Sequence, residues 1–560
     1  MADERADAYI REHEQLASRR GVWENHWREV AERVRPNANY FQRRDRPGGD
    51  KRQEKVFDAT APLALPKFAA AVISMSFPAN QRYQRLAATD PALEKDDSVR
   101  KYLDAFTDLL FRVRYSPTAN FQSQSGEVVL DVGAFGTGVL FIDDVYGIGI
   151  RYKSFPLSEC WIAEDAHGRV DTLYRKFKYT PHQAATMFGG LSKLPERIRT
   201  AYEKDPHNQQ FEFLHAVKPN LNPNPKRKDW QGMAFSSCYI AYEDRHFISE
   251  SGFREFPFAV PRYETNPREA YGRSPAMNVL PAIKMLNEQK KTVLRAGQRV
   301  VSPPIMLTDD GSLQAFNVRP DALNYGYVDS NGRALAVPLQ SNGRVDIGLD
   351  MMNAEREAIN DAFFVTLFRI LVEEPQITAT EAMLRAQEKG QLLAPTMGRI
   401  QTELLGPTTQ REIDILVQSG TAERVLGPMP PALMEAGGEI KIDYQSPLNL
   451  AQRAGAGMGI MNTMQAIAPL AQIDPRVMTV FDPIEMAREL AQINGMPEKC
   501  IRSDEQVAAI DEQQAKASQA QQLLAAAPVV ASTVKDLSQA QAMAGAAPNQ
   551  EAPAVIPQGG

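Results

Sequence analysis

Residues 274–371 constrain the possible fold more than any other part of the sequence, because they predict two long helices separated by a short β-rich segment. Ser274 and Pro275 are typical of a helix start, since serine caps free N–H groups and proline suits the first turn. Apolar residues then recur at helical spacing to about 299 and again over about 346–371. Such an up-and-down pair could pack on itself or against the same pair of a neighbouring subunit.

The two predicted helices differ in charge. Residues 274–299 hold five basic side chains and one acidic side chain, a net charge of +4, whereas residues 346–374 hold seven acidic and two basic side chains, a net charge of −5. Each helix also has an apolar face that suits a partner helix. The apolar positions are Val279, Leu280, Ile283, Leu286, Val293 and Leu294 on the first helix, and Met352, Ile359, Phe363 and Ile370 on the second.

The chain before residue 274 changes from helical to β-rich. Residues 1–35 predict a helix docked on a core, with an apolar stripe formed by Trp23, Trp27, Val30 and Val34. Residues 61–77 and 98–130 also have a helical pattern. From about 137 to 264, short runs rich in Phe, Tyr, Ile and Val predict a mixed β region with one inserted helix near 181–203.

The chain after the helix pair is again mostly helical. A capping box at Thr378 and Glu381 starts a helical region that we expect to reach about Val417, with an interruption near Gly406 and Pro407. Later elements are expected as a short strand within 439–446, helices within 451–498 and a polar helix over 504–527. The Ala-, Gln- and Pro-rich residues 528–560 are predicted to be disordered.

Signatures of catalysis and of cofactor or metal binding are missing from the sequence. No phosphate-binding G-x-x-x-x-G-K-[ST] loop occurs, none of the seven histidines forms H-E-x-x-H, and the three cysteines are scattered. The net charge of −6 argues against a strongly basic nucleic-acid-binding protein. No apolar run reaches the roughly 20 residues that span a bilayer. We therefore expect no enzyme activity, cofactor, metal or membrane partner.

Two local patterns invite a functional interpretation, but a structural one is favoured for both. Gly133, Gly136 and Gly138 do not complete G-x-G-x-x-G, and they run from a helix into a strand, so a turn with positive φ is favoured over a phosphate site. Asp143 and Asp144 are adjacent on a predicted strand and should point to opposite faces. A solvated strand end is therefore favoured over a metal pair.

Four segments, in this order along the chain, resemble the head-to-tail connector, or portal, proteins of short-tailed bacteriophages. The resemblance covers roughly residues 10–510, with the helix–β–helix insert between the second and third segments. The segments are GEVVLDVGAFGTGVLFID (126–143), PRYETNPREAYGRSPAMNVLPAIKMLNEQ (261–289), ITATEAMLRAQEKGQLLAPTMGRIQTELL (377–405) and IDYQSPLNLAQRAGAGMGIMNTMQAI (442–467).

The resemblance implies a mainly helical α+β portal-type fold with wing, stem, clip and crown. The domains would be an N-terminal wing at 1–272, a first stem helix at 273–299, a clip at 300–345, a second stem helix at 346–372, a tunnel loop and long helix returning to the wing at 373–450, a helical crown at 451–527 and the tail at 528–560. It implies a closed ring, expected as a dodecamer, at one capsid vertex of the virion, assembled in the host cytoplasm.

The resemblance also implies partners and site residues. Double-stranded DNA would pass through the ring without sequence specificity, and terminase large subunit, tail adaptor, major capsid and scaffolding proteins would bind it. Channel or tunnel candidates are Lys284, Lys290, Lys291, Arg295, Glu373, Glu374 and Gln376. Inter-subunit stem candidates are Lys290, Lys291, Asp350, Glu357 and Asp361. Clip residues expected to bind partners are Asp309, Asp310, Arg319, Tyr325 and Arg333.

The net negative charge of the chain is consistent with a channel through which DNA slides. Each Lys or Arg that contacts a phosphate adds affinity through counterion release, so a channel with few such contacts does not hold the DNA tightly. The oppositely charged stem helices suggest that the basic helix of one subunit lies beside the acidic helix of the next, although the lysines could instead line the channel.

Two other classes of protein are considered as alternatives to a portal. A tail or adaptor ring protein would lack the helix–β–helix insert, and a nuclease or packaging ATPase would need the catalytic motifs that the sequence lacks.

Overall fold

The computed structural model describes most of the chain up to residue 445, and beyond it three shorter stretches and two single residues. Two compact units are distinguished, Met1–Gly495 and Met496–Gly560, and the second is described chiefly by one helix at 506–518. The described residues are 4–38, 41, 52–94, 96–145, 147, 149–224, 226–227, 229–307, 317, 319, 322–339, 345–367, 395–445, 457–469, 480–493, 496, 502 and 506–518. The tail predicted at 528–560 lies outside them.

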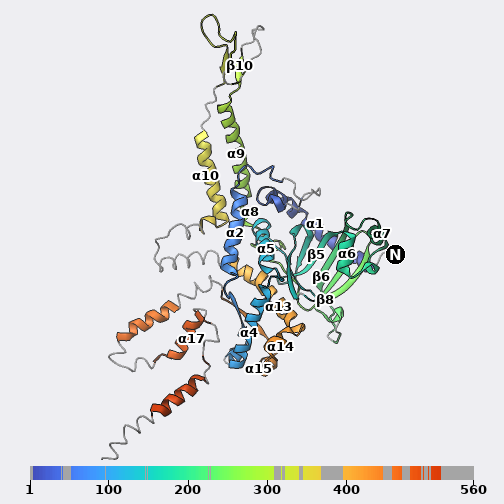
Figure 1. The fold of residues 1–560 in the computed structure, drawn as a ribbon, viewed down its shortest axis with the longest axis vertical. Helices are drawn as coiled ribbons and strands as arrows, with labels where there is room; N and C mark the ends of the chain where they lie inside the picture. Colours follow the sequence, from blue (N-terminus) through green and yellow to red (C-terminus); the bar gives the residue numbers. More distant parts are fainter. Residues whose placement is uncertain are drawn as a thin grey trace, which may run out of the picture. The chain divides into compact units, whose positions relative to one another are not determined.

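A five-stranded antiparallel sheet lies at the centre of the β-rich region (Figure 1). Its strands follow chain order, and neighbouring strands pair antiparallel. They are β4 (Cys160–Glu164), β5 (Val170–Tyr179), β6 (Phe211–Pro219), β7 (Phe235–Ala241) and β8 (His246–Phe253). A second sheet has the order β3-β2-β9 and comprises β2 (Leu140–Val145), β3 (Gly149–Ser154) and β9 (Phe258–Ala259). The predicted mixed β region is therefore confirmed.

The single helix expected near 181–203 is in fact two helices, so that expectation needs correction. α6 (Pro181–Phe188) and α7 (Glu196–Lys204) are separated by Gly189 and Gly190, whose φ angles are +74° and +122°. A left-handed glycine at the C-cap ends a helix, because its N–H closes the last turn while its backbone turns away. Both helices cover one end of the five-stranded sheet through a separate apolar cluster that includes Phe188, Ile198 and Phe213.

The main core lies where the N-terminal helices meet the smaller sheet. α1 (Glu4–Arg33) confirms the predicted helix, and its Trp27 and Val30 are fully buried. α2 (Thr60–Ser76) packs on α5 (Phe121–Phe135), and α4 (Asp97–Arg114) packs on β1 (Gln84–Ala88). The stretch 98–130, which had a helical pattern, is divided by a turn between α4 and α5. α3 (Pro91–Glu94) is one short turn before α4.

A two-stranded sheet joins parts of the chain that are far apart in sequence. β1 (Gln84–Ala88) pairs antiparallel with β12 (Ile440–Tyr444), so that Gln84 lies opposite Tyr444. The sequence predicted β12 but not β1, which lies in the gap between two helical patterns. This pairing fixes the returning C-terminal segment against the N-terminal helices.

The expected interruption at Gly406 and Pro407 is absorbed within a continuous helical segment. Residues 395–399 are α-helical, Ile400–Leu405 form a π-helix, and α13 (Gly406–Gln418) follows directly. Proline lacks an N–H and crowds the preceding turn, and a wider π turn accommodates it without ending the helix. α14 (Thr421–Leu426) and α15 (Pro431–Glu435) then lead to β12. The residues described over 4–272 and 395–445 are called the body below.

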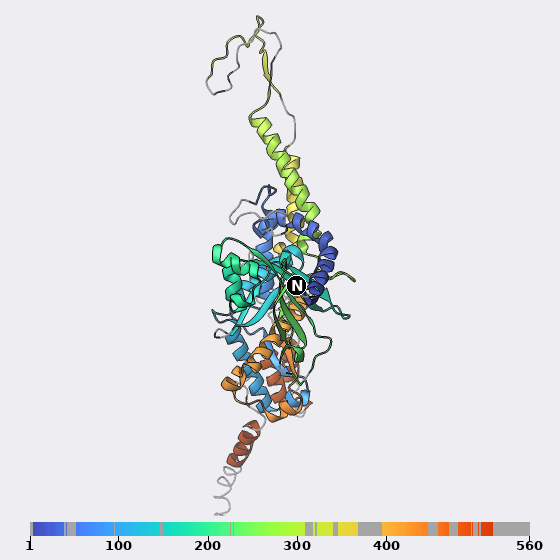
Figure 2. The ribbon, with the colours of Figure 1, turned by 90° about the vertical axis from the view of Figure 1, so that its right-hand side faces the viewer.

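The predicted helix pair is present as a helical hairpin, a name used below for α9, β10, β11 and α10. Ser274 caps the short helix α8 (Pro275–Asn278), and α9 (Leu280–Val301) continues from it. α10 (Val345–Ala362) lies beside α9, as Figures 1 and 2 both show. The helix is interrupted at Phe363 and Phe364, where Phe364 adopts a left-handed conformation with φ +56°. Residues 365–367 are helical again, and the expected end near 371 lies outside the described residues. The strands β10 (Ile305–Leu307) and β11 (Ala336–Pro338) pair between the helices.

The helices expected within 451–498 are present where the chain is described. The helix at 457–469 begins against the end of α17 (Pro483–Ile493), since a Cβ on Gly457 would lie 3.3 Å from the Ile493 side chain. This close approach explains why a glycine occupies position 457. Among the helices that the structure describes, none is both long and apolar enough to cross a membrane.

Candidate functional site

The candidate site is the helical hairpin, and an apolar seam holds its two helices together. Met352 and Ile359 of α10 are fully buried, as is Phe363 just beyond its end. Gly348 permits the close approach of the helices, because a Cβ there would lie 2.8 Å from the Val293 side chain. These contacts confirm the predicted face of α10 as far as Phe363; Ile370 lies outside the described residues. The helices pack on each other within one chain, which was one of two arrangements left open by the sequence.

The predicted face of α9 is confirmed except at Leu294. Leu280, Ile283 and Leu286 are buried, but Leu294 is 49% exposed. The first half of α9 contacts α1 and α8 as well as α10, whereas burial decreases along its second half. Helical periodicity identifies an apolar face, but neighbouring elements decide how far along the helix that face is covered.

The base of α9 is fixed to the end of α5 by a close contact between two backbones. Gly136 caps α5 with φ +79°, and a Cβ on it would lie 2.1 Å from the carbonyl oxygen of Gly272. Nearby, the Thr137 hydroxyl accepts a hydrogen bond from the Gly272 N–H, and the Ser274 hydroxyl donates to the Ala134 carbonyl. Of the three glycines, Gly136 therefore forms the expected turn with positive φ, and it positions the hairpin.

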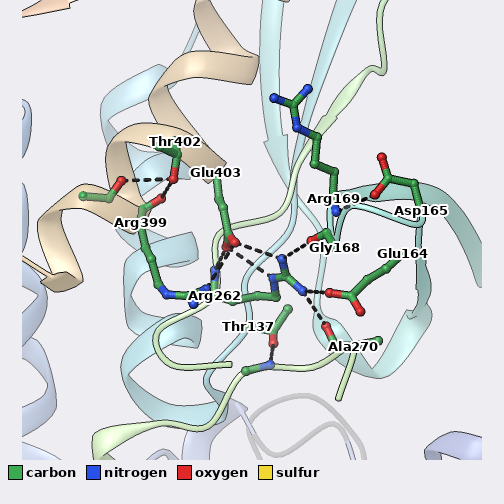
Figure 3. A network of polar contacts seen from close by, with 12 residues as sticks. Thr137, Glu164, Asp165, Gly168, Arg169, Arg262, Ala270, Arg399, Thr402 and Glu403 are labelled. Carbon is green, nitrogen blue, oxygen red and sulfur yellow. Dashed lines mark hydrogen bonds and ion pairs between the residues drawn. The ribbon is translucent and has the colours of Figure 1, made fainter. Parts of the chain in front are cut away.

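A buried arginine joins three segments beside this base (Figure 3). The Arg262 guanidinium is 4% exposed, and its Nη2 lies 2.9 Å from Oε1 of Glu403 in the π-helix. It also pairs with Glu164 at the end of β4 and donates to the carbonyls of Gly168 and Ala270. Burial alone would lower the pKa of Arg262, but its bonds to the two carboxylates raise that pKa above its ordinary value. The cluster fixes the π turn against the segment that enters α8.

Asp58 connects the body to both helices of the hairpin. The side-chain oxygen of Asn287 on α9 accepts hydrogen bonds from the N–H groups of Phe57 and Asp58, at 2.7 and 3.1 Å. The Asp58 carboxylate in turn lies 2.7 Å from the guanidinium of Arg356 on α10. Burial would raise the pKa of Asp58, but hydrogen bonds from Thr60 and Arg356 hold it below its ordinary value. The segment before α2 therefore acts as a clamp across the hairpin.

The basic candidates of α9 differ in their contacts. Lys284 pairs with Glu29 of α1, and Lys291 lies 3.5 Å from Glu288 of its own helix. Lys290 and Arg295 form no ion pair with any described residue, and Arg295 is exposed. Lys284 therefore belongs to the attachment of the hairpin, whereas Lys290 and Arg295 remain available to a partner.

The acidic candidates of α10 all face solvent in the single chain. Asp350, Glu357 and Asp361 are exposed, and within the described part of the chain none of them has a basic partner. The two helices carry opposite charge, yet between their described side chains no ion pair forms. The seam is apolar, and the charges lie away from it.

The described part of the clip region has an unusual amount of exposed apolar surface. Tyr325 is 74% exposed, and Arg319 and Arg333 are also exposed. Around the pair β10–β11 the exposed apolar side chains are Val300, Val301, Met306, Leu307, Leu323, Val328, Val337 and Leu339. Monomeric soluble proteins seldom expose many large apolar side chains together, so this region has the character of an interaction surface.

Several predicted site residues lie outside the described residues, namely Asp309 and Asp310 of the clip and Glu373, Glu374 and Gln376 of the tunnel loop. The remaining channel and stem candidates are on α9 and α10, and the remaining clip candidates lie between β10 and β11. Sequence reasoning missed Arg262, Asn287 and Asp58, which hold the hairpin to the body. Of these three, only Asn287 could have been found from the sequence pattern, because it is a polar residue within the apolar face of a predicted helix.

Comparison with known proteins identifies relatives along nearly the whole chain. The family described as "Bacteriophage head to tail connecting protein" matches residues 6–501. The chain is 29% identical over 520 residues to the "Probable portal protein" of Bordetella phage BPP-1, covering 91% of each. It is 26% identical over 548 residues to the "Portal protein" of Salmonella phage epsilon15, covering 97% of each.

Solved structures with partial similarity come from gene transfer agent particles. A chain from the neck of the native particle, computed with C12 symmetry, aligns with a TM-score of 0.33 and 11% identity, over 72% of this chain and 85% of that chain. A chain from the virion of the native particle aligns with a TM-score of 0.31 and 11% identity, over the same shares of both chains.

Proposed function

The chain belongs to the bacteriophage head to tail connecting protein family, and we propose from this premise how its parts serve as a phage portal. The match over residues 6–501, with portal proteins as relatives over more than nine-tenths of their lengths, carries the functional conclusion. The protein forms the portal vertex of the virion, through which DNA enters the capsid and later leaves it. It acts as a structural component, without catalysis of its own.

Twelve copies in a closed ring are the assembly we propose. A cyclic ring requires a head-to-tail interface in which two different surfaces of each subunit meet. The hairpin supplies two such surfaces, because exposed cations lie on α9 and exposed carboxylates on α10. A dodecamer would carry a net charge of about −72, from −6 per chain, which opposes tight binding of DNA.

The basic face of α9 in one subunit is proposed to lie against the acidic face of α10 in the next. Lys290 and Lys291 would approach Asp350, Glu357 and Asp361 of the neighbour. The absence of an ion pair between the two helices within one chain, among the residues described, supports this pairing between chains. Each contact is weak when exposed, but twelve repeated sets in a ring act together.

Reversing Lys290→Glu and Lys291→Glu together tests this interface. The change should weaken ring assembly, most strongly at low salt, where charge repulsion is least screened. Unchanged assembly at low salt would reject the pairing. If the lysines instead line the channel, the rings should form normally and DNA packaging should change.

The exposed apolar surface around β10–β11 is proposed as the docking surface for the packaging terminase and, after packaging, for the tail adaptor. Arg319, Tyr325 and Arg333 would contribute polar and aromatic contacts. Major capsid and scaffolding proteins are proposed to contact the body during assembly in the host cytoplasm. The loop containing Glu373, Glu374 and Gln376 is proposed to form the narrowest part of the channel.

The native mass of the purified chain is the decisive measurement. A ring of twelve 62.3-kDa chains has a mass of about 750 kDa, and negative-stain images should show a central hole. A stable monomer that assembles only with scaffold would show that the hairpin does not suffice to close a ring. A smaller closed ring without affinity for terminase would favour a tail or adaptor component.

A further inference from the structure

The helix α2 has an outer face that is unusually apolar for a surface in contact with water. Lys67 is the only charged side chain among its 17 residues. Leu65 and Phe68 on the inner face are buried, whereas Leu63 on the outer face is 61% exposed. The other exposed small or apolar side chains of the outer face are Pro66, Ala70 and Ser74. A helix that is apolar on all sides is normally enclosed by protein, so this face suits a partner.

A second exposed apolar patch lies at the base of the hairpin, where α9 leaves the body. Pro281 and Met285 are one turn apart on α9 and both are exposed, Met285 by 48%. The neighbouring Lys284 pairs with Glu29 of α1. Val22 lies two turns before Glu29 on the same side of α1 and is 81% exposed. The base of α9 and the adjoining part of α1 therefore offer apolar side chains to a partner.

These two patches belong to different sides of the hairpin base. α2 packs against α10, whereas α1 packs against α9, and Figure 1 shows α1 and α2 on either side of α8. In the ring proposed above, α9 of one copy lies beside α10 of the next. The same pairing brings α1 and the base of α9 in one copy towards α2 of the next copy. Two different surfaces then meet across one boundary, as a head-to-tail interface requires.

The two patches also carry opposite charges. Lys67 on α2 is exposed and forms no ion pair with any residue that the structure describes. Glu288 lies one turn beyond Met285 on α9, and its side chain is 72% exposed, 3.5 Å from Lys291. Complementary charges at an interface select the partner and fix its register. A second copy of this chain supplies both the apolar side chains and the opposite charge that suit the outer face of α2.

We propose that the outer face of α2 packs against the base of α9 and the adjoining part of α1 in the next copy of the ring. Leu63 lies against Met285 in this contact, and Lys67 approaches Glu288. The inference rests on the proposed ring and adds to it a surface outside the hairpin. Burial of apolar side chains stabilises an interface more than exposed ion pairs do. The contact of α2 therefore supplies most of the stability of the ring, while the charges of the hairpin select the orientation.

Disulfide cross-linking of the assembled full-length chain tests this contact. Leu63→Cys with Met285→Cys, in a chain that also carries Cys500→Ser, should form disulfides between copies on oxidation, because a disulfide requires the two residues to be in contact. Each copy is then linked to both neighbours, so a denaturing gel without reductant should show a ladder of covalent oligomers. Neither cysteine alone should give the ladder. The matched control is Leu63→Cys with Met187→Cys, since Met187 of α6 is exposed to a similar degree as Met285 and should give none.

A second variant measures the contribution of the face itself. Leu63→Glu should leave the unfolding temperature of the isolated subunit unchanged and lower the fraction of chain in rings by roughly tenfold, because the interface would bury an unpaired charge. Leu221→Glu is the control, since Leu221 is 90% exposed between β6 and β7, and it should leave the rings unchanged.

Three results would overturn the proposal, and they differ in what they say of the portal function. Rings of normal native mass without a ladder would reject the contact and leave the portal function intact. A lower unfolding temperature of the Leu63→Glu subunit would show that the face is covered within its own chain. Absence of rings from the unsubstituted chain, with scaffold present, would reject the ring itself together with this interface.

Discussion

The body and the helical hairpin of this portal protein differ in where their charged side chains lie and in what those side chains contact. In the body, Arg114 is fully buried, and its guanidinium lies 2.5–2.8 Å from the carboxylate of Glu412 and 2.5 Å from the hydroxyl of Tyr83. On the hairpin, Asp350, Glu357 and Asp361 are exposed and have no partner among the described residues. The buried charge of Arg114 is neutralised inside the body, whereas these three carboxylates of the hairpin face outward.

This difference separates stability from assembly. A buried ion pair is costly to break, because the remaining charge is left without water or a partner. An exposed charge contributes little to the stability of the chain that holds it but can select a neighbour. We therefore expect substitutions of buried residues in the body to unfold the subunit and substitutions on the hairpin to alter the ring.

The largest effect is expected from Arg114→Met. It leaves the Glu412 carboxylate buried without its partner, so the free energy of unfolding should fall by about 3–5 kcal/mol. Urea unfolding followed by circular dichroism measures this change. The double substitution Arg114→Met with Glu412→Leu should recover a large part of the loss. If the double variant is as unstable as the single one, packing rather than charge accounts for the effect.

A somewhat smaller loss is expected from Gly136→Ala at the junction between body and hairpin. Alanine is strained at φ +79°, and its Cβ would collide with the Gly272 carbonyl, so we expect a loss of at least about 2 kcal/mol. Gly21→Ala is the matched control, because it lies in α1 with nothing within 4 Å of its Cβ. The control should stabilise the protein by about 0.5–1 kcal/mol, since alanine favours a helix. Equal effects of the two changes in thermal unfolding would contradict this account of the junction.

Lowering the pH should destabilise the body before it destabilises the hairpin, since all seven histidines lie before residue 273. Burial, and then the charges of Lys176 and Arg20, lower the pKa of His13 to about 4. A group whose pKa is lower in the folded state than its value of about 6.5 in the unfolded chain stabilises the neutral form, so this stability is lost as the pH falls from about 6.5 towards 4. The unfolding temperature should decline over that range, and His13→Gln should reduce the decline. An equal decline in the variant would assign the effect to other groups.

The smallest effect on the stability of the isolated subunit is expected from removing the charges of the exposed carboxylates of α10. The combined changes Asp350→Asn, Glu357→Gln and Asp361→Asn should alter the free energy of unfolding by less than about 0.5 kcal/mol per site. Ring formation, measured by native mass at low salt, should nevertheless weaken. A large change in subunit stability with normal rings would reverse the proposed division between body and hairpin.

Local signals predicted much of this architecture. Alternating aromatic and β-branched residues gave the strands of the five-stranded sheet, and Ser274 with Pro275 gave the start of the hairpin. The break at Gly189 and Gly190 was missed because the flanking helical patterns read as one. The strand β1 was missed because its pairing with β12 depends on residues more than 300 positions away.

The sequence by itself determined which helices form, which of their faces are apolar and that the two hairpin helices carry opposite charge, because these properties depend on residues a few positions apart. Only the tertiary structure decided that Arg262 joins the π turn to β4 and that Asp58 bridges α9 and α10. Those arrangements depend on contacts between distant segments, whose geometry is fixed by packing of the whole core. Periodicity describes one element at a time and therefore cannot specify them.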